Sequence, residues 1–420
     1  MNPMRRMRLW IALFAAAPFS SGQSELTPET ILLARIRYHM SQMLQKQPNY
    51  TCQQSIERSR RRAASQKYEI VDTVRLEVAL VGSRELFSWP GAGKFEEVDI
   101  ADMVRGGAIG NGNFALHARS VFLSSAATFI YAGEVTHEGR RAVKFDYKIP
   151  QYRSGYSVRM GEIEAVVGYI GAFWADPETL DLIRLEVSAD DIPPQLPVSA
   201  ASDAMEYERV RIGDGNFLLP ASSDMRIADL RGNESRNRTR FMNCRQYTGE
   251  SVLTFEDLPE EETPLAKSPP AQIEVPEGLE LDLKLMTPVD SSKNAVGDAV
   301  EAVVDRAAKR NGRVIVPKGA AVKGRITRLE HRPRPAPHYI IALDFSTLEF
   351  EGHQAVLHGT VQSVSRSLVA ANPAYAIRQL ERAYRESRDN TLFEPGTRLR
   401  MPRGWRFVWR AGAASTEEIK

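Results

Sequence analysis

The sequence predicts a mainly β protein of the α+β class, built from two β-rich units with few helices. Short runs rich in β-branched and aromatic residues, separated by Gly, Pro and Asp turns, succeed one another from residue 50 to 255 and again from 277 to 409. Between these stretches, residues 256–276 hold five prolines and six acidic residues, which is typical of an extended, solvated linker. A length of 420 residues also favours two or three domains over one.

Helical spacing in the first unit is confined to two segments. Thr27 and Pro28 suit the N-cap and first turn of a helix, and apolar residues recur at helical spacing as far as Lys46. A second, short helix is predicted over 114–125, after a Gly-rich loop at 106–112. Strands are predicted over residues 50–58, 68–81, 85–89, 129–136, 141–149, 157–167, 168–174, 182–188, 207–212, 216–219, 225–230 and 238–255.

The second unit is predicted to be all-β with one helix. Asn372 and Pro373 suit the start of a helix that runs to Ser387. Strands are predicted over residues 279–286, 299–304, 313–316, 321–329, 339–345, 354–361, 396–401 and 405–409.

Composition and charge exclude several classes of protein. With 43% hydrophobic and 26% charged residues, the chain is neither wholly disordered nor a coiled coil or a collagen-like repeat. A formal net charge of +2 excludes a polycation.

The first 22 residues predict a cleaved secretory signal peptide of the Sec type. Arg5, Arg6 and Arg8 precede the apolar run Leu9–Ala17, which is too short to cross a bilayer core of about 30 Å. A buried N-terminal helix is the alternative. No later segment reaches about 18 apolar residues, so we expect a periplasmic or secreted protein without a transmembrane segment. The expected parts are a signal peptide (1–22), a first unit (23–255), a linker (256–276), a second unit (277–412) and a disordered tail (413–420).

The two cysteines of the chain, Cys52 and Cys244, predict one disulfide. In an oxidising compartment a lone pair of cysteines usually forms a bond. Two free buried thiols are the alternative, and a two-cysteine metal site is less favoured because no histidines cluster near either residue.

No motif in the sequence predicts an enzyme, a cofactor or a metal site. Dinucleotide, P-loop and zinc-protease motifs are absent, and so is the Gly-x-Ser-x-Gly nucleophile motif. His353 and His358, five residues apart on a predicted strand, would face opposite sides. Glu162 and Glu164 would share one strand face, which is more typical of a solvated surface than of acid–base catalysis. We predict no catalytic residue, no cofactor and no metal, and an enzyme is the least favoured alternative.

Several local sequences of the first unit recur in a known family. The opening helix runs directly into Tyr50-Thr51-Cys52, a strand ends in Leu86-Phe87-Ser88-Trp89, and the turn Trp174-Ala175-Asp176-Pro177-Glu178-Thr179 precedes another strand. With Phe217-Leu218-Leu219-Pro220, these features resemble the lipoprotein-carrier and outer-membrane lipoprotein-sorting proteins of the bacterial envelope. The resemblance implies a curved antiparallel half-barrel whose apolar concave face is covered by lid helices.

A half-open barrel with one covered mouth can hold the acyl chains of a lipid or lipoprotein. The candidate lining residues are Phe87, Trp89, Phe122, Phe129, Tyr131 and Trp174. Phe173 and Trp174 cannot both line the cavity, because neighbouring strand residues face opposite sides. An ordinary filled core is the alternative interpretation of these rings.

Arginines predict where the anionic part of a ligand would bind. If the two cysteines lie opposite each other on antiparallel strands, Arg58 faces Arg238 and Arg60 faces Arg236. Like charges directly opposite each other are destabilising, and an anionic headgroup would relieve that repulsion. A solvated strand end with splayed side chains is the alternative. Because we expect export, envelope polyanions are favoured and nucleic acid is not.

The second unit carries two further signals, Leu281–Ser291 and Val314–Gly324, the latter of the form apolar run, Pro, basic residue, Gly. They resemble the C-terminal β-barrel of the VirB10/TrbI family of secretion-channel scaffolds. The resemblance implies a small β-barrel with one helical excursion, for which residues 372–387 are the candidate, and an envelope protein as partner.

We therefore predict an exported, non-enzymatic protein of the bacterial cell envelope. Its first unit would bind or sense an amphiphilic lipid or lipoprotein ligand, and its second would dock to an envelope protein. The alternative is a structural scaffold of an envelope or secretion complex, with both units filled by their own side chains.

Overall fold

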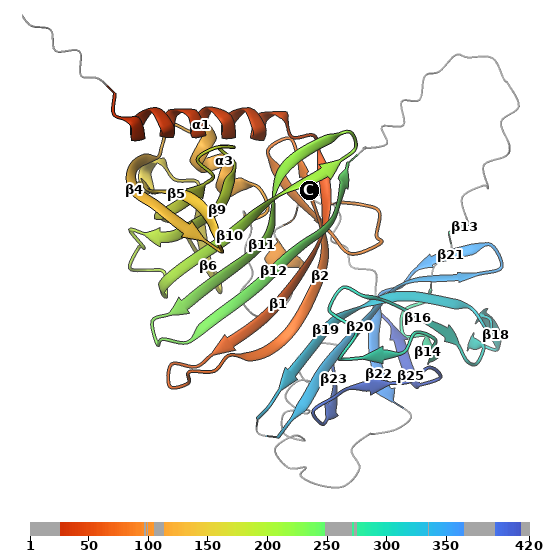
Figure 1. Cartoon of the computed structure of the whole chain (residues 1–420). Helices are drawn as coiled ribbons and strands as arrows, with labels where there is room; N and C mark the ends of the chain where they lie inside the picture. The colour runs from red at the N-terminus through yellow and green to blue at the C-terminus, as the bar shows by residue number, and fades with distance from the viewer. Residues whose placement is uncertain are drawn as a thin grey trace, which may run out of the picture.

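The computed structural model describes residues 26–95, 98, 100–104, 113–247, 271–272, 275–334, 336–364 and 391–412. Two large β-sheets account for most of these residues, and helices lie against the first (Figure 1). The predicted fold class, a mainly β protein with a curled antiparallel half-barrel, is confirmed. The predicted signal peptide, most of the predicted linker, the predicted helix at 372–387 and the predicted tail lie outside the described residues.

The first sheet has ten strands in the order β3-β2-β1-β12-β11-β10-β9-β8-β5-β4. It curls, and α1 lies across the strands at one end (Figure 1). Its strands are β1 (Tyr50–Arg61), β2 (Glu69–Val81), β3 (Arg84–Ser88), β4 (Thr128–His137), β5 (Arg140–Ile149), β8 (Gly168–Ala175), β9 (Leu182–Asp190), β10 (Val198–Ile212), β11 (Gly215–Asp229) and β12 (Glu234–Gln246). A separate hairpin consists of β6 (Ser157–Met160) and β7 (Ile163–Val166).

Helices cover the concave side of this sheet. α1 (Pro28–Lys46) begins where the sequence predicts, because the Thr27 side chain accepts a hydrogen bond from the backbone of the first turn at 3.3 Å. Further along are α2 (Ile100–Met103) and α3 (Leu116–Leu123). The buried side chains of α1 recur every four residues and so form one stripe: Ile36, Met40 and Leu44.

The second sheet has nine strands in the order β13-β21-β20-β19-β16-β14-β25-β22, with β23 paired to β20 outside this path. They are β13 (Ala271–Gln272), β14 (Glu280–Leu285), β16 (Ala299–Val304), β19 (Ala321–Arg332), β20 (His338–Phe350), β21 (His353–Val356), β22 (Gly359–Val364), β23 (Thr391–Pro395) and β25 (Arg406–Ala411). Two small pairs accompany it: β15 (Val289–Asp290) with β24 (Arg400–Met401), and β17 (Ala308–Arg310) with β18 (Arg313–Val316). Phe345 packs against Phe407 and Trp409 in its core, with ring centroids 5.6 and 5.9 Å apart.

The second unit meets the first sheet along the edge of β2. β3 pairs only with residues 77–81 of β2, which leaves the preceding part of that edge open. Val296 fills the gap: the Arg75 amide donates to the Val296 carbonyl at 2.8 Å, and the Val296 amide donates to the Thr73 carbonyl at 2.9 Å. This pairing covers backbone groups that would otherwise be open to pairing with another chain.

Side chains strengthen this junction. The Arg75 guanidinium donates to both carboxylate oxygens of Asp298, at 2.9 and 2.8 Å. Gly297 has a φ of +98°, and a Cβ there would lie 2.3 Å from the Arg75 carbonyl oxygen, so only glycine fits. The Arg325 guanidinium lies 5.4 Å from the centroid of the Trp89 ring. One continuous cluster of buried apolar side chains runs through both units, which therefore share a core.

Several strand predictions differ from the structure. β11 joins the predicted strands 216–219 and 225–230, and the predicted strand 354–361 is divided between β21 and β22. Residues 157–167 were expected as one strand but form the hairpin β6–β7, because Gly161 has a φ of +61° and turns the chain. β10 begins at Val198, nine residues before the predicted start at 207. Its first half consists largely of small residues, so the alternation that marks a strand is weak there.

Candidate functional site

The inner face of the first sheet carries two transverse rows of side chains. Through paired residues, the first row contains Val74, Ile56, Thr239, Ser223, Met205, Leu185, Phe173, Phe145 and Tyr131. The second row contains Asp72, Arg58, Asn237, Met225, Asp203, Val187, Gly171, Tyr147 and Phe129. Asp203 belongs to this row because it lies on β10 between the paired residues Ser202–Arg226 and Met205–Ser223, which places it opposite Met225. Side chains from β4, β5 and β8 are mostly aromatic, whereas those from β1, β10, β11 and β12 include most of the polar ones.

We divide this face into two parts. The aromatic half comprises Phe129, Tyr131, Phe145, Tyr147 and Phe173, together with Phe122 of α3. The polar half comprises Gln54, Arg58, Asp72, Asp203, Ser223, Asn237 and Thr239, together with Asn113 from the segment before α3.

The rings of the aromatic half form one packed group around Phe173. The Phe145 ring stacks on it with centroids 5.3 Å apart, and Phe122 meets it edge-on at 5.2 Å. Phe129 lies 5.9 Å away, while Tyr131 contacts Phe145 at 5.2 Å. Such tilted and stacked ring contacts add to the stability that the core gains from burying apolar surface.

Gly171 lets the Tyr147 ring lie flat on the sheet. A Cβ at Gly171 would lie 2.7 Å from the Tyr147 hydroxyl oxygen and 1.9 Å from the Glu186 carbonyl oxygen. The Tyr147 hydroxyl donates to that same carbonyl at 2.7 Å. A side chain at position 171 would therefore displace the ring from the row.

α1 covers the aromatic half, and its buried stripe packs into the same cluster. His39 Nε2 of α1 lies 2.8 Å from Asp181 Oδ1, just before β9. The Gln47 side chain, at the end of α1, donates to the Leu218 carbonyl at 3.1 Å. α1 is thus attached near its middle and at its C-terminal end by side-chain hydrogen bonds, and an apolar stripe supplies the rest of the contact.

A buried ion pair stands at one end of the polar half. Arg58 Nε donates to Asp72 Oδ1 at 2.7 Å and Arg58 Nη2 to Asp72 Oδ2 at 2.6 Å. The two side chains are only 5% and 1% exposed. Removing either partner would leave the other charge buried and uncompensated, which is strongly destabilising.

Asp203 is a buried acid that has no ion-pair partner in the part of the chain that the structure describes. Burial raises the pKa of Asp203 to about 7, although hydrogen bonds from the Ala204 amide and the Asn113 side chain oppose the rise. The Asn113 amide group also donates to Ser223 Oγ at 2.9 Å. Among the described residues, nothing donates a hydrogen bond to Asp203 Oδ1 or to Gln54 Oε1. The sequence prediction did not include Asp203, because the segment around it was not recognised as a strand.

Three of the predicted lining residues, Phe122, Phe129 and Tyr131, lie in the aromatic half. The other three do not. Phe87 is buried in the cluster that both units share, and Trp89 lies at the junction with the second unit.

Trp174 lies on the outer face of the sheet, opposite to Phe173. The Lys144 ammonium and the Arg184 guanidinium lie 5.1 and 5.6 Å from the centroid of its ring. The placement of Trp174 inside the barrel is therefore wrong, because strand pairing assigns the inner face to its neighbour.

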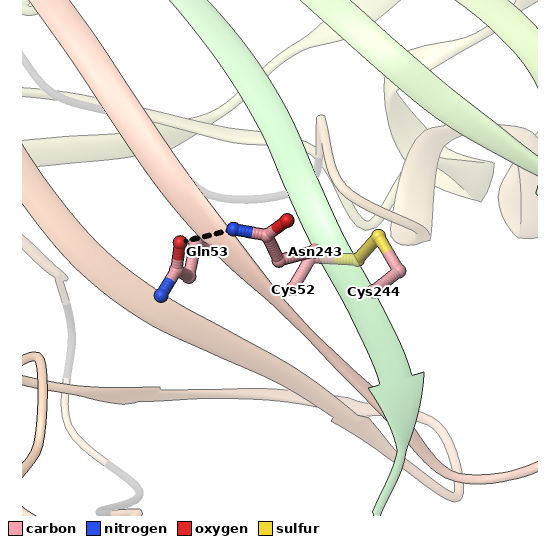
Figure 2. Close-up of a disulfide and its surroundings, with 4 residues drawn as sticks. All are labelled: Cys52, Gln53, Asn243 and Cys244. Carbon is pink, nitrogen blue, oxygen red and sulfur yellow. Dashed lines mark hydrogen bonds between the residues drawn. A yellow bond between two sulfur atoms is a disulfide. The ribbon is translucent and has the colours of Figure 1, made fainter.

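The predicted disulfide between Cys52 and Cys244 is confirmed (Figure 2). The register predicted from it is wrong by one residue. β1 and β12 are antiparallel, but a bulge between Thr51 and Gln53 shifts the pairing, and Asn243 has a φ of +52° there. The Asn243 amide donates to Gln53 Oε1 at 2.7 Å across the two strands (Figure 2).

Because of this shift, the predicted arginines do not face one another. Arg58 is opposite Asn237, while Arg238 is opposite Glu57 and forms an ion pair with it. Their facing repulsion, and the anion site built on it, is therefore not present.

The two remaining arginines are also separate. Arg236 is opposite Ser59, and its Nε donates to Asp224 Oδ1 at 2.8 Å on the outer face. Burial and the nearby Arg332 of the second unit lower the pKa of Arg60. The predicted cluster is thus divided between the inner face, the outer face and the junction.

Among the described residues, no group of three His, Cys, Asp or Glu side chains is placed to hold a metal ion. No helix in the described part of the chain is long and apolar enough to span a membrane.

No protein-family model matches this chain, and no curated protein matches it. Solved structures do. A domain described as an outer membrane lipoprotein-sorting protein from Vibrio parahaemolyticus is 12% identical over 51% of this chain and 92% of its own, with a TM-score of 0.28. A LolA superfamily protein from Nitrosomonas europaea is 8% identical over 54% and 94%, with a TM-score of 0.27. A DUF1329 family protein from Desulfovibrio piger is 12% identical over 53% and 95%, with a TM-score of 0.29.

The first of these names matches the family that residues 27–255 resemble. No similarity of the second unit to the VirB10/TrbI barrel is shown, and that resemblance stays a prediction.

Proposed function

We propose that this protein binds an amphiphile without catalysing a reaction, and that the acyl chain lies between the aromatic half and helices α1 and α3. The observation that carries the proposal is a curved, aromatic sheet face covered by helices. A helix that is attached by a few side-chain hydrogen bonds can move away from the sheet as a unit. A cover made of β-strands hydrogen-bonded to the sheet could not. An acyl chain can therefore take the place of the helical side chains.

The free-energy cost of exposing the buried stripe of α1 is comparable to the gain from burying an acyl chain in its place. Exposing the stripe of α1, formed by Ile36, Met40 and Leu44, costs roughly 1.5–3 kcal/mol for each side chain, or about 5–9 kcal/mol together. A buried acyl chain contributes about 0.8 kcal/mol for each CH₂, or about 12 kcal/mol for a chain of roughly 16 carbons. A long chain can thus compensate for displacing the helix, but a short one cannot.

The remaining parts of the proposal follow from the sequence. We assign the protein to the periplasm or the exported fraction, with cleavage of residues 1–22, and we place a lipid or lipoprotein in the first unit. The second unit, from 277 to 412, would contact an envelope protein. The disulfide supports an oxidising compartment, in which such bonds persist.

Binding of a fluorescent fatty-acid probe to the exported, disulfide-bonded chain tests the proposal. We expect saturable binding that Phe129→Ala weakens about tenfold or more, because the half-buried Phe129 ring belongs to the aromatic half. Trp174→Ala is the matched control, since that ring lies on the outer face and its loss leaves the inner face unchanged. Absence of saturable binding, or equal losses in both variants, contradicts the proposal.

A structural scaffold is the second candidate, and one observation favours it. Phe145 and Phe173 are at most 1% exposed, so the aromatic half is already filled by the protein's own side chains. Native mass spectrometry of the protein purified from the periplasm distinguishes the two. Co-purified lipid supports binding, whereas a bare chain that also fails to bind the probe supports the scaffold.

A further inference from the structure

The polar half contains hydrogen-bond acceptors for which the described part of the chain supplies no donor. Gln54 is 2% exposed and Asp203 is 5% exposed. In the described part of the chain, Gln54 Oε1 and Asp203 Oδ1 both lack a hydrogen-bond partner. A buried acceptor without a donor destabilises the fold, so such groups are kept where something else satisfies them. A group that donates a hydrogen bond would satisfy either atom, and Asp203 is the one that Asn113 contacts.

Asn113 shows what kind of donor fits this place. Its side chain is 5% exposed, and its amide group donates to Ser223 and forms a hydrogen bond with Asp203. Asn113 immediately precedes the turn into α3, which covers the aromatic half. When an amphiphile binds, its headgroup would take the place of the Asn113 side chain. The acceptors that this side chain contacted then face the polar end of the incoming ligand.

The charges around this place favour a donor over an anion. Arg58 already donates to both oxygens of Asp72, so that pair is electrically neutral. Glu85 and Asp224 both act on Asp203 to make its ionisation less favourable, which means that the local field is negative. A carboxylate or phosphate would be repelled there, whereas an ammonium or amide N–H would be attracted.

We propose that the polar half recognises a nitrogen-bearing headgroup, an amine or amide whose N–H group donates to Asp203. The inference rests on the amphiphile binding proposed above and specifies its polar end. It places the acyl chain across the aromatic half and the nitrogen two to four strands away, on the same inner face.

Competition against a bound fluorescent fatty-acid probe tests the inference on the full exported chain. Dodecylamine, dodecanamide and laurate share one chain length and differ in the headgroup. At pH 8, where Asp203 is ionised, we expect the amine and the amide to displace the probe at concentrations about tenfold lower than laurate, because a hydrogen bond to a charged group is among the stronger ones. Asp203→Asn should remove the preference for the amine.

Glu57→Gln is the control, since Glu57 lies on the outer face, where it pairs with Arg238, and it does not contribute to the shifted pKa of Asp203. It should leave the preference unchanged. Equal displacement by the three compounds, a preference for laurate, or an amine preference that survives in Asp203→Asn overturns the headgroup assignment while leaving amphiphile binding intact. If the probe itself does not bind, both proposals fail together.

Discussion

Replacing Asp203 by Asn should stabilise the protein above neutral pH. The carboxyl of Asp203 is buried and its pKa is raised to about 7, whereas an unfolded chain ionises near the ordinary value of 3.8. Between these values the folded state holds a proton that the unfolded state has lost. The free energy of unfolding therefore falls as pH rises from about 4 to about 7, and is constant above that range as far as this group is concerned.

The size of the effect follows from the shift of about three pH units. At about 1.4 kcal/mol for each unit, the ionised carboxylate costs up to about 4 kcal/mol at pH 8. Asn has nearly the same shape and no charge, so it avoids this cost. The variant should be more stable than the wild type by up to about 4 kcal/mol at pH 8, and the difference should shrink to about 1 kcal/mol near pH 4.5, where the unfolded chain is already mostly ionised.

Urea unfolding of both proteins from pH 4.5 to pH 8.5 measures this difference, and the contributions of other titrating groups cancel in it. Asp224→Asn provides a control of opposite sign. Although burial raises its pKa, hydrogen bonds from Arg236 and Arg226 hold the net pKa of Asp224 below its ordinary value. Its ionised form stabilises the fold at neutral pH, and that variant should be less stable there. A stability gap for Asp203→Asn that does not change with pH would refute the reasoning.

Three further substitutions test the fold. Gly171→Ala should lower the free energy of unfolding by about 1–3 kcal/mol, measured by urea denaturation, because its Cβ would collide with the Tyr147 ring. Cys52→Ser should cost about 2–5 kcal/mol, and reduction of the wild type should reproduce that loss if the disulfide is the cause. Gly297→Ala should loosen the junction, because its Cβ would meet the Arg75 carbonyl. Calorimetry should then resolve two thermal transitions where the wild type shows one, and a single unchanged transition would contradict the shared core.

Local signals in the sequence predicted the elements well, because they depend on near neighbours. Thr27 and Pro28 set the start of α1. The turn after Trp174 forms because Asp176 Oδ1 accepts hydrogen bonds from the Glu178 and Thr179 amides, at 2.8 and 3.0 Å. The disulfide also followed from the sequence, since only one pair of cysteines exists.

The register and the inner face depended on features that the sequence does not show. One extra residue at the bulge near Asn243 moved Arg236, Arg238 and Arg240 of β12 to new partners. Alternation indicated that either Phe173 or Trp174 faces inward, but pairing with β5 and β9 decides which. The first half of β10, which carries Asp203, consists largely of small residues and lacks the apolar–polar alternation of a strand. The polar half was therefore not predicted from the sequence.

The junction between the two units could not be predicted from the sequence either. Val296 and Gly297 lie in a short loop with no periodic pattern, and their role depends on the length of β3. Because β3 ends early, the open edge of β2 needs a partner, and the second unit supplies it. No local signal in either segment reports such a contact between distant parts of the chain.

The dependence of affinity on acyl-chain length tests the proposed function most directly. A series of alkyl competitors from 8 to 16 carbons, each with the same headgroup, should displace a fluorescent fatty-acid probe from the disulfide-bonded chain with rising affinity. At about 0.8 kcal/mol for each buried CH₂, every two carbons should lower the dissociation constant by about tenfold until the aromatic half is filled. An affinity that does not change with chain length, or no saturable displacement at any length, would contradict an acyl-binding inner face.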